Sequence, residues 1–491
     1  MNYQLVYKLQ AIILGALTVG FGGSALIAAT LDDPTRHPEA LAGFLVSALV
    51  SASVGIALFF LGRGASNAIF RREALAVIGI GWISASLFGA LPYYLILPEV
   101  DFAAALFEST SGFTTTGASV LSDLERLPRS ILFWRSISQW IGGLGVIVLF
   151  VAVLSFLGAG AKVLFSRESS AQATELDTAR VQRGIFRLML LYFGLSAACM
   201  GALMLCGLDW FDALAHTFTT ISTGGFSTRS GSIADFANPT LEWVIIIFMI
   251  IGGTSFIPML RFLRGQWSAL GKSTEIKAYL LLLLLASTTV TLIHFFAGHT
   301  FTSIEETIRA STFQVVSIMT TSGFATEDFD TWVPSTHTIL LFLMAIGGCS
   351  GSTSGGAKVI RFVIAAKIAL QHLERAYRAH VIRPLRVNRE PLDRDGQEAI
   401  LVFFVMLGLI TIFGLLGVVL MEPNLSLEGG LSAGYACFFN IGPGLAEVGP
   451  AQTFGFLGDG THVLLSLLMI LGRVELFAVL VLFLPAFWKR Y

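Results

Sequence analysis

Charged residues are scarce in this chain of 491 residues, because Asp, Glu, Lys and Arg together make up only 13% of it. Soluble domains carry about 25% charged residues, so the chain lacks the charge that a water-exposed surface needs. This shortage excludes an ordinary cytosolic enzyme, a disordered protein and a basic nucleic-acid-binding protein. The hydrophobic content of 55% instead indicates a multipass membrane protein.

Cysteine is also rare. The four cysteines lie in apolar stretches and show neither a CxxC nor a CxxH spacing. The sequence therefore predicts small buried thiols, without a disulfide framework or a zinc site. The motifs of a membrane enzyme, such as HExxH, GxSxG or paired intramembrane aspartates, are missing as well. Arg473 and Glu475 form the only ionisable pair that the sequence places inside an apolar segment.

Ten apolar segments are long enough to cross a bilayer core, which is about 30 Å thick and needs roughly 20 residues per helix. They are 9–31, 41–62, 74–98, 131–158, 184–207, 239–263, 277–298, 336–372, 398–421 and 461–488. The first is predicted to be a transmembrane helix and not a signal peptide, because its apolar run is long and further spans follow at once.

Four shorter apolar stretches each run into a tract rich in Gly, Thr and Ser; they lie at 102–112, 211–221, 304–319 and 428–439. They are too short to span, so we interpret them as half-helices that enter the membrane and turn back. The predicted fold is an all-α integral membrane protein with ten transmembrane helices and four re-entrant pore half-helices.

The net charge of −1 hides two opposed sets of loops. One set, which includes both termini, carries 24 Lys and Arg against 10 Asp and Glu, and the other carries 6 against 21. The positive-inside rule places the first set, and thus both termini, in the cytoplasm. The second set of loops includes Glu108, Asp328 and Glu447, near the Gly-, Thr- and Ser-rich tracts. We expect these acids either to concentrate cations at the outer mouth of a pore or to lie in solvated loops.

The tracts after the four short stretches form an internal repeat. Their glycines at 117, 225, 323 and 442 are each followed, 24 to 30 residues later, by another glycine in the next long helix. Four tracts in one register favour a pseudo-fourfold pore over simple loop turns. We predict four M1-P-M2 repeats over 69–180, 181–272, 273–394 and 395–491, preceded by two helices in 1–68.

The tract residues suit a cation. Backbone carbonyls can replace the hydration oxygens of a potassium ion if the chain is extended and directed inward, which glycine allows. Each half-helix would direct its partially negative C-terminus at that ion. The predicted filter, the one place where we expect bound K⁺, comprises Thr115, Thr116, Gly117, Thr223, Gly224, Gly225, Thr321, Ser322, Gly323, Asn440, Ile441 and Gly442.

Together with the tracts, the sequences Gly347–Arg361 and Met469–Glu475 closely resemble the Trk/Ktr/HKT superfamily of potassium transporters. The two additional N-terminal spans resemble its bacterial TrkH/TrkG branch. The resemblance implies a potassium-uptake subunit of the bacterial inner membrane that forms a homodimer. It also implies regulation by a cytosolic partner resembling TrkA, and a nucleotide such as ATP, ADP or NAD would bind only to that partner.

Other transport modes stay open at this point. A filter determines what binds and not what is coupled, so channel-like flux and symport with a proton or sodium ion are alternatives, as are different preferences between K⁺ and Na⁺. A carrier of another solute is a weaker alternative, because it would show inverted or two-fold repeats.

The segment 347–356 should interrupt a helix that would otherwise run from 336 to 372, because Gly, Ser and Thr are poor helix formers. By resemblance it is an intramembrane gating loop, with a passive kink as the alternative; its residues are Gly347, Gly348, Cys349, Ser350, Gly351, Ser352, Thr353, Ser354, Gly355 and Gly356. Arg473 lies in the last apolar segment, where a charge usually faces a cavity. We interpret it as a pore cation, not as the partner of Glu475.

Two further segments have open interpretations. The basic segment 371–394 is predicted to dock the regulatory partner or lipid headgroups, or to be simply solvated. His216, in the second half-helix, is predicted to be a packed or hydrogen-bonded side chain and not a proton relay.

Overall fold

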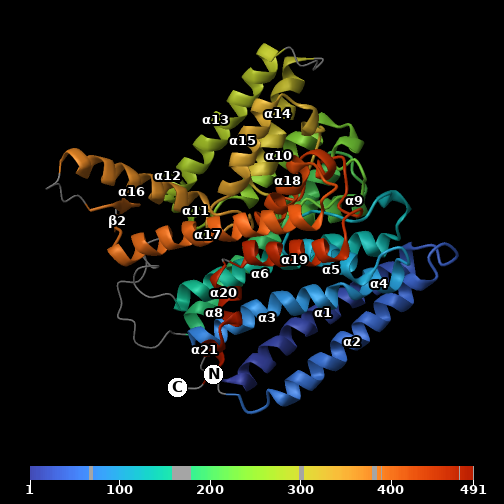
Figure 1. Cartoon of the computed structure of the whole chain (residues 1–491). Coiled ribbons are helices and arrows are strands. Elements are labelled where there is room, and N and C mark those ends of the chain that lie inside the picture. Colours follow the sequence, from blue (N-terminus) through green and yellow to red (C-terminus); the bar gives the residue numbers. More distant parts are fainter. Residues whose placement is uncertain are drawn as a thin grey trace.

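The computed structural model describes residues 1–65, 70–156, 178–297, 303–378, 384–388, 390–474 and 476–489. These residues are almost entirely helical, as predicted. They contain a single antiparallel strand pair, in which Arg386 of β1 (Arg386–Val387) lies opposite Pro391 of β2 (Glu390–Pro391). The long helices run roughly side by side, with both chain ends near one end of the bundle (Figure 1).

Two N-terminal helices, α1 (Tyr3–Leu31) and α2 (Glu39–Leu61), pack along each other at one flank of the bundle (Figure 1). Ser51 of α2 donates a hydrogen bond to the carbonyl oxygen of Leu14 in α1, at 3.0 Å. The chain termini meet beside this pair, because the Tyr3 hydroxyl donates to the carbonyl oxygen of Trp488 at 3.0 Å.

The remaining helices form four units in which a short helix lies between longer ones. The first unit contains α3 (Arg71–Gly89), α4 (Leu91–Ile96), α5 (Phe102–Phe113), η1 (Leu124–Arg126) and α6 (Arg129–Phe156). The second contains α8 (Thr178–Leu205), α9 (Trp210–Ile221), η2 (Ala234–Phe236), α10 (Pro239–Gly252), α11 (Phe256–Leu263) and α12 (Ser268–Lys272).

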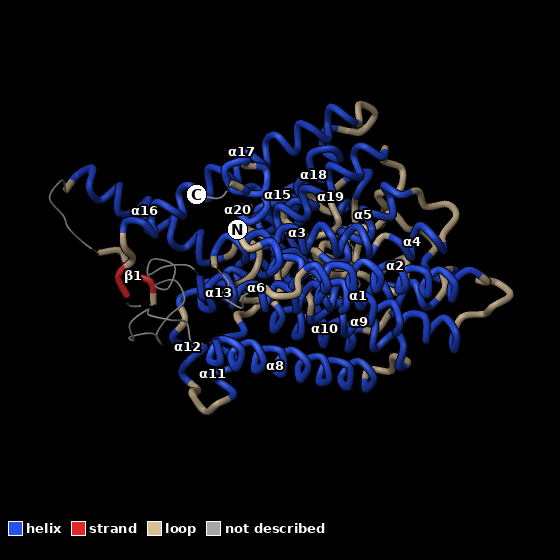
Figure 2. The backbone as a smooth tube through the Cα atoms, turned by 90° about the horizontal axis from the view of Figure 1, so that it is seen from below, coloured by secondary structure: helices blue, strands red, loops and turns tan. Residues whose placement is uncertain are grey.

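The third and fourth units follow the same order. The third contains α13 (Thr274–Ala297), α14 (Ile304–Met319), η3 (Phe329–Thr331), α15 (Pro334–Ile346) and α16 (Val359–Tyr377). The fourth contains α17 (Arg394–Met421), α18 (Leu427–Phe438), η4 (Ala446–Val448), α19 (Asp459–Arg473), α20 (Phe477–Leu480), η5 (Val481–Phe483) and α21 (Pro485–Trp488). Figure 2 shows α11, α12, β1 and α16 towards the end of the molecule opposite to α4.

Within the described residues, seven helices are long and apolar enough to cross a membrane, or up to nine if each bent pair counts as one span. The one remaining predicted span, 336–372, is divided between α15 and α16, and α15 is too short to be counted by length. The structure therefore supports a multipass helical protein, while the count of ten spans stays a prediction.

In the second, third and fourth units, the long helix that follows the short helix is broken. α10 and α11 meet at 101°, and α19 and α20 meet at 117°, so the predictions of single helices over 239–263 and 461–488 are wrong. At the first break, backbone N–H groups of the segment 347–356 bind the carbonyl oxygens of Gly252 and Gly253, at 3.3 and 2.9 Å. At the second break, Leu476 has a φ of 55° and directly precedes α20. The predicted interruption of 336–372 is confirmed, since α15 ends at Ile346 and α16 begins at Val359.

The four short helices α5, α9, α14 and α18 begin and end within one residue of the predicted stretches. Each begins with a side-chain cap that accepts a hydrogen bond from the backbone N–H three residues later; the caps are Asp101, Asp209, Ser303 and Ser426. Asp and Ser are favoured at this position because their oxygens satisfy an otherwise unpaired donor. The sequence therefore determines where each short helix starts.

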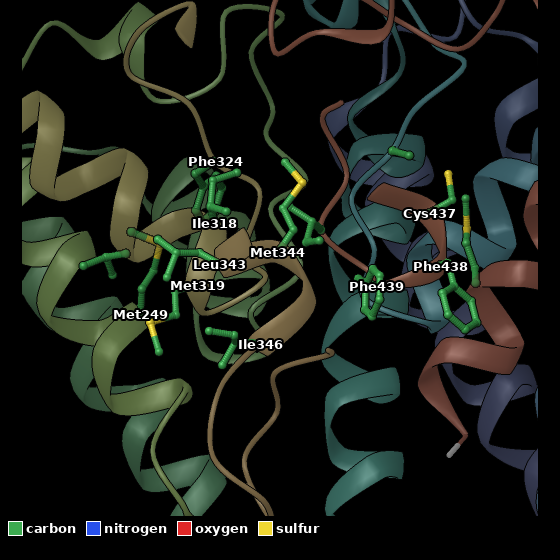
Figure 3. Packing of buried hydrophobic residues seen from close by; sticks show 14 of the residues in the cluster. Met249, Ile318, Met319, Phe324, Leu343, Met344, Ile346, Cys437, Phe438 and Phe439 are labelled. Atoms are coloured by element: carbon green, nitrogen blue, oxygen red, sulfur yellow. The ribbon is translucent and has the colours of Figure 1, made fainter. Parts of the chain in front are cut away.

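The largest buried hydrophobic cluster of the described residues joins all four units, with most of its members in the second, third and fourth. Figure 3 shows part of it, including Ile318 and Met319 of α14 near Leu343 of α15, and Phe438 and Phe439 at the end of α18. These residues are at most 4% exposed. The core thus packs around the ends of the short helices, where the tracts begin.

Candidate ion pore

All four tracts turn in the same way directly after their short helices. The second residue after each helix, Thr115, Thr223, Thr321 or Asn440, has a left-handed backbone with φ between 52° and 58°. This conformation is an outlier for a β-branched residue and costs on the order of 1–3 kcal/mol. Two residues later, the tract glycines at 117, 225, 323 and 442 have φ between 76° and 105°.

A backbone hydrogen bond holds each turn. In every tract, one residue stands between the left-handed residue and the glycine. Its backbone N–H donates to the carbonyl oxygen five residues earlier, at 2.8–2.9 Å. The donors are Thr116, Gly224, Ser322 and Ile441, and the acceptors are Ser111, Thr219, Ser317 and Ala436. The four glycines that the sequence aligned therefore occupy equivalent backbone positions.

The tracts contact one another in a closed ring. A Cβ atom added to each tract glycine would lie within 1.8–2.8 Å of a carbonyl oxygen in the next tract. Gly117 faces Gly224, Gly225 faces Ser322, Gly323 faces Ile441, and Gly442 faces Thr116. A side chain cannot fit at these distances, so glycine is required both by φ and by space. Eight predicted filter residues thus meet around one centre.

The glycine that follows each tract glycine, 24 to 30 residues later in the next long helix, allows close packing. A Cβ atom at Gly142 would lie 2.0 Å from the carbonyl oxygen of Phe113, and one at Gly472 would lie 1.7 Å from that of Phe438. The C-termini of α5 and α18 therefore rest directly on the helices that follow. The C-terminal end of a helix dipole carries partial negative charge, which favours a cation near the ring.

The segment 347–356 packs against these helix ends. The Thr353 hydroxyl lies 2.9 Å from the carbonyl oxygen of Ile221, at the end of α9, and the Gly355 N–H donates to the Thr321 hydroxyl at 2.6 Å. The buried carboxylate of Glu275 accepts a hydrogen bond from the Ser350 N–H at 2.6 Å. The segment predicted as a gating loop is thus hydrogen-bonded to the end of α9 and to the third tract.

Arg473 is buried at the end of α19 and donates from Nη2 to the carbonyl oxygen of Thr353, at 2.7 Å. Its Nε and Nη1 atoms have no hydrogen-bond partner among the described residues. Glu475, two residues further along the chain, lies outside the described residues. Arg473 therefore contacts the segment that also contacts the tracts.

Two amides in this region break the fourfold pattern. Asn440 donates from Nδ2 to the Thr116 hydroxyl at 3.0 Å, which joins the fourth tract to the first. Gln139 of α6, which the sequence analysis missed, donates to the carbonyl oxygen of Gly224 at 2.7 Å and accepts from the Phe226 N–H at 3.1 Å. The sequence does mark Gln139 as different: it lies three residues before its helix glycine, where the other units have Met249, Met344 and Met469.

The segments after the tract glycines also form a closed ring. Hydrogen bonds of 2.8–3.1 Å join Leu124 to Ser230, Ile233 to Ala325, Ala446 to Asp330 and Phe454 to Ser119. These contacts link units one to two, two to three, three to four and four to one. The four units therefore enclose one common axis.

The outer acids have different surroundings. Glu108 is fully buried and forms an ion pair with Arg135, between Oε1 and Nε at 2.8 Å. Both its predicted locations, a cation-attracting mouth and a solvated loop, are therefore wrong, and so is the idea that Arg473 and Glu475 are the only interior pair. Glu447 is exposed, and a hydrogen bond from the Ser426 hydroxyl lowers its pKa.

The remaining sequence assignments concern other parts of the chain. His216 is buried and hydrogen-bonded on both ring nitrogens, as predicted. In the basic segment, residues 379–383 and 389 lie outside the described residues. The described residues contain no group of three or more His, Cys, Asp or Glu side chains that could hold a metal ion.

Comparisons with known proteins agree with this architecture. The family TrkH, described as a cation transport protein, matches residues 51–490. The chain is 35% identical over 459 residues to the Trk system potassium uptake protein TrkI of Halomonas elongata, covering 92% of this chain and 91% of that protein. It is 33% identical over 481 residues to the Trk system potassium uptake protein TrkH of Escherichia coli K12, covering 97% and 98%.

A solved structure also matches along its whole length. The crystal structure of the potassium transporter TrkH from Vibrio parahaemolyticus superimposes with a TM-score of 0.90 at 29% identity, and the alignment covers 100% of both chains. On the family match and the identities above 30%, this chain belongs to the TrkH family of cation transport proteins.

Proposed function

We propose that this membrane transporter takes up potassium ions through a pore at the centre of the four tracts. The potassium uptake activity named for its relatives supports the ion, and the closed ring of glycines and carbonyl oxygens supports the site. The family consists of transporters and not of enzymes. The ring is the observation that carries the proposal, because it brings four separate parts of the chain to one point.

The tract backbone would replace the water around the ion. Carbonyl oxygens of Thr116, Gly224, Ser322 and Ile441 lie at the contacts between neighbouring tracts. Such oxygens, together with hydroxyl groups, are the ligands that potassium pores use in place of hydration water. The C-termini of the four short helices add a negative potential. The filter then consists of the twelve tract residues predicted from the sequence.

The segment 347–356 would be the gate. Its hydrogen bonds to Ile221 and Thr321 hold it against the ends of two short helices, so ions could pass only after these bonds break. Arg473, which binds the same segment, would place a positive charge on the ion path and keep ions from binding too tightly. We assign the structure to a closed state on these contacts.

The wider arrangement follows from charge and family. The basic loops and both termini would face the cytoplasm of a bacterium, with ten spans and four pore repeats in each chain. A homodimer regulated by a cytosolic TrkA-like, nucleotide-binding subunit is the assembly that the family resemblance implies. Whether the flux is coupled to protons or sodium is decided by measuring reversal potentials in mixed K⁺/Na⁺ gradients at two pH values.

The filter assignment is tested by replacing Gly323 with serine. Its Cβ atom would lie 2.1 Å from the carbonyl oxygen of Ile441, and its φ is 76°. We expect ⁸⁶Rb⁺ influx into liposomes to be lost or to become insensitive to competing K⁺. Gly408→Ser is the matched control, because a Cβ at Gly408 in α17 meets nothing within 4 Å. Equal, K⁺-insensitive flux in wild type and Gly323→Ser would refute the filter.

A further inference from the structure

Each short helix carries at least one buried polar side chain that binds the segment following its own tract. We infer that these four side chains, Glu108, His216, Gln314 and Ser432, form a bracing layer behind the tracts that sets how well the pore rejects ions smaller than potassium. This inference rests on the proposed function. It concerns residues outside the filter and outside the gate.

The bracing layer follows the internal repeat. Glu108, His216 and Gln314 each lie nine residues before their tract glycine, and Ser432 lies ten residues before, next to Ala433. The first three are 0% exposed and Ser432 is 3% exposed. Three unlike side chains at one repeat position, all buried, point to a common task, because a buried polar group is costly unless it is hydrogen-bonded.

The bonds of the bracing layer reach the same part of each unit. Glu108 Oε2 accepts from the Val120 N–H at 2.9 Å, and His216 Nε2 lies 2.9 Å from the Ser227 hydroxyl. The two remaining contacts are from Gln314 Nε2 to the carbonyl oxygen of Glu327 at 3.3 Å, and from the Leu445 N–H to the Ser432 hydroxyl at 2.9 Å. All four partners lie two to four residues beyond the tract glycine.

The second unit shows how strictly the bond direction is set. His216 Nδ1 lies 2.8 Å from the carbonyl oxygen of Asp212, which can only accept, so Nδ1 carries the proton. In the neutral ring, Nε2 must then accept a hydrogen bond from the Ser227 hydroxyl. That hydroxyl oxygen accepts in turn from the Arg229 N–H at 3.0 Å. The chain after the second tract is thus held by a directed series of bonds.

Arg135 connects the first two braces. Its Nε binds Glu108 at 2.8 Å. Its Nη2 donates to the Ser119 hydroxyl at 3.1 Å and its Nη1 to the carbonyl oxygen of Ser227 at 3.0 Å, so one side chain restrains the segments after both tracts. The guanidinium also lies over the Phe226 ring, 4.1 Å from its centroid. The braces therefore act on neighbouring units together.

A braced ring favours a larger ion for a physical reason. A smaller cation is fully coordinated only if the surrounding oxygens move closer to it, whereas K⁺ is already coordinated at the wider spacing. Hydrogen bonds between each short helix and the segment after its tract resist that inward movement. Removing one brace should thus improve Na⁺ entry more than it changes K⁺ entry.

The test compares two variants of His216 in proteoliposomes, with the ratio of ⁸⁶Rb⁺ to ²²Na⁺ influx as the measurement. His216→Leu removes both ring bonds, of which only the one to Ser227 braces the segment after the tract. We therefore expect the ratio to fall roughly five-fold, the effect of one lost hydrogen bond. His216→Gln can still donate and accept, and it should keep the ratio within about two-fold of wild type. Ser47→Ala is the control and should keep the wild-type ratio, because the buried hydroxyl of Ser47 donates to the carbonyl oxygen of Gly43 within α2, outside the four pore units.

The outcomes separate the possibilities. A ratio that stays at the wild-type value in His216→Leu while both fluxes fall equally would overturn the inference, because the side chain would then serve packing only. If His216→Leu does not give a monodisperse protein, Gln314→Leu and Ser432→Ala decide in the same assay. If neither wild type nor the gate variant Thr353→Val admits either ion above empty liposomes, the proposed function itself is refuted.

Discussion

Replacing Glu108 with glutamine removes the carboxylate that faces Arg135 in the protein interior. The two side chains are 0% and 2% exposed, and Nε and Oε1 are 2.8 Å apart. Glutamine has nearly the same shape, so the main change is a buried guanidinium without a countercharge. Removing one partner of a buried pair costs about 3–5 kcal/mol, and burial leaves little solvent screening to reduce this cost. We expect a clearly lower unfolding midpoint for Glu108→Gln.

Thermal unfolding of the purified protein in detergent measures this effect. Asp123→Asn is the matched control, because Asp123 and Arg126 form a pair whose side chains are 72% and 85% exposed. Exposed pairs contribute about 0–1 kcal/mol, so its midpoint should stay near that of wild type. The double variant Glu108→Leu with Arg135→Met should recover much of the lost stability, since an apolar replacement of a buried pair is often tolerated. Equal midpoints for Glu108→Gln and Asp123→Asn would refute the reasoning.

Two further predictions concern the gate and the outer surface. Thr353→Val keeps the side-chain shape but removes the hydroxyl that lies 2.9 Å from the carbonyl oxygen of Ile221 and 3.1 Å from that of Gly252. Basal ⁸⁶Rb⁺ flux without a partner should therefore rise roughly five-fold. Unchanged flux would argue against the gate. The Ser426 hydroxyl holds the pKa of Glu447 below its ordinary value of 4.5. The Glu447 carboxylate therefore stabilises the fold at pH values above 4.5, and this contribution is lost as the pH falls through the lowered pKa. Ser426→Ala should therefore show a smaller drop in unfolding midpoint between about pH 5 and about pH 3 than wild type; an identical drop would contradict it.

The short helices and their tracts were predictable because their signals are local. Asp101 and Ser426 cap helices within three residues of themselves, and the glycine at 117 is required by its own φ. The breaks after Gly253 and Arg473 were not predictable, because both lie in apolar stretches that read as continuous spans. The first depends on bonds from a segment about 100 residues away, which no local pattern records.

The role of Glu108 shows the same limit at the site. Its position before a polar tract suggested an outer, hydrated acid, but the fold places Arg135 of the next helix against it. Gln139 was missed for a similar reason, since its partners Gly224 and Phe226 belong to another unit. Partners across units are chosen by packing, and composition does not encode them.

The sequence by itself determined the membrane class, the four short helices and the repeated glycines, since low charge, apolar length and backbone freedom are properties of short segments. Only the tertiary structure decided that the tracts close into a ring from Gly117 through to Gly442 and which side chains brace it. The physical reason is distance along the chain. Contacts between units separated by about 100 residues depend on how whole helices pack, and that packing exists only in the folded protein.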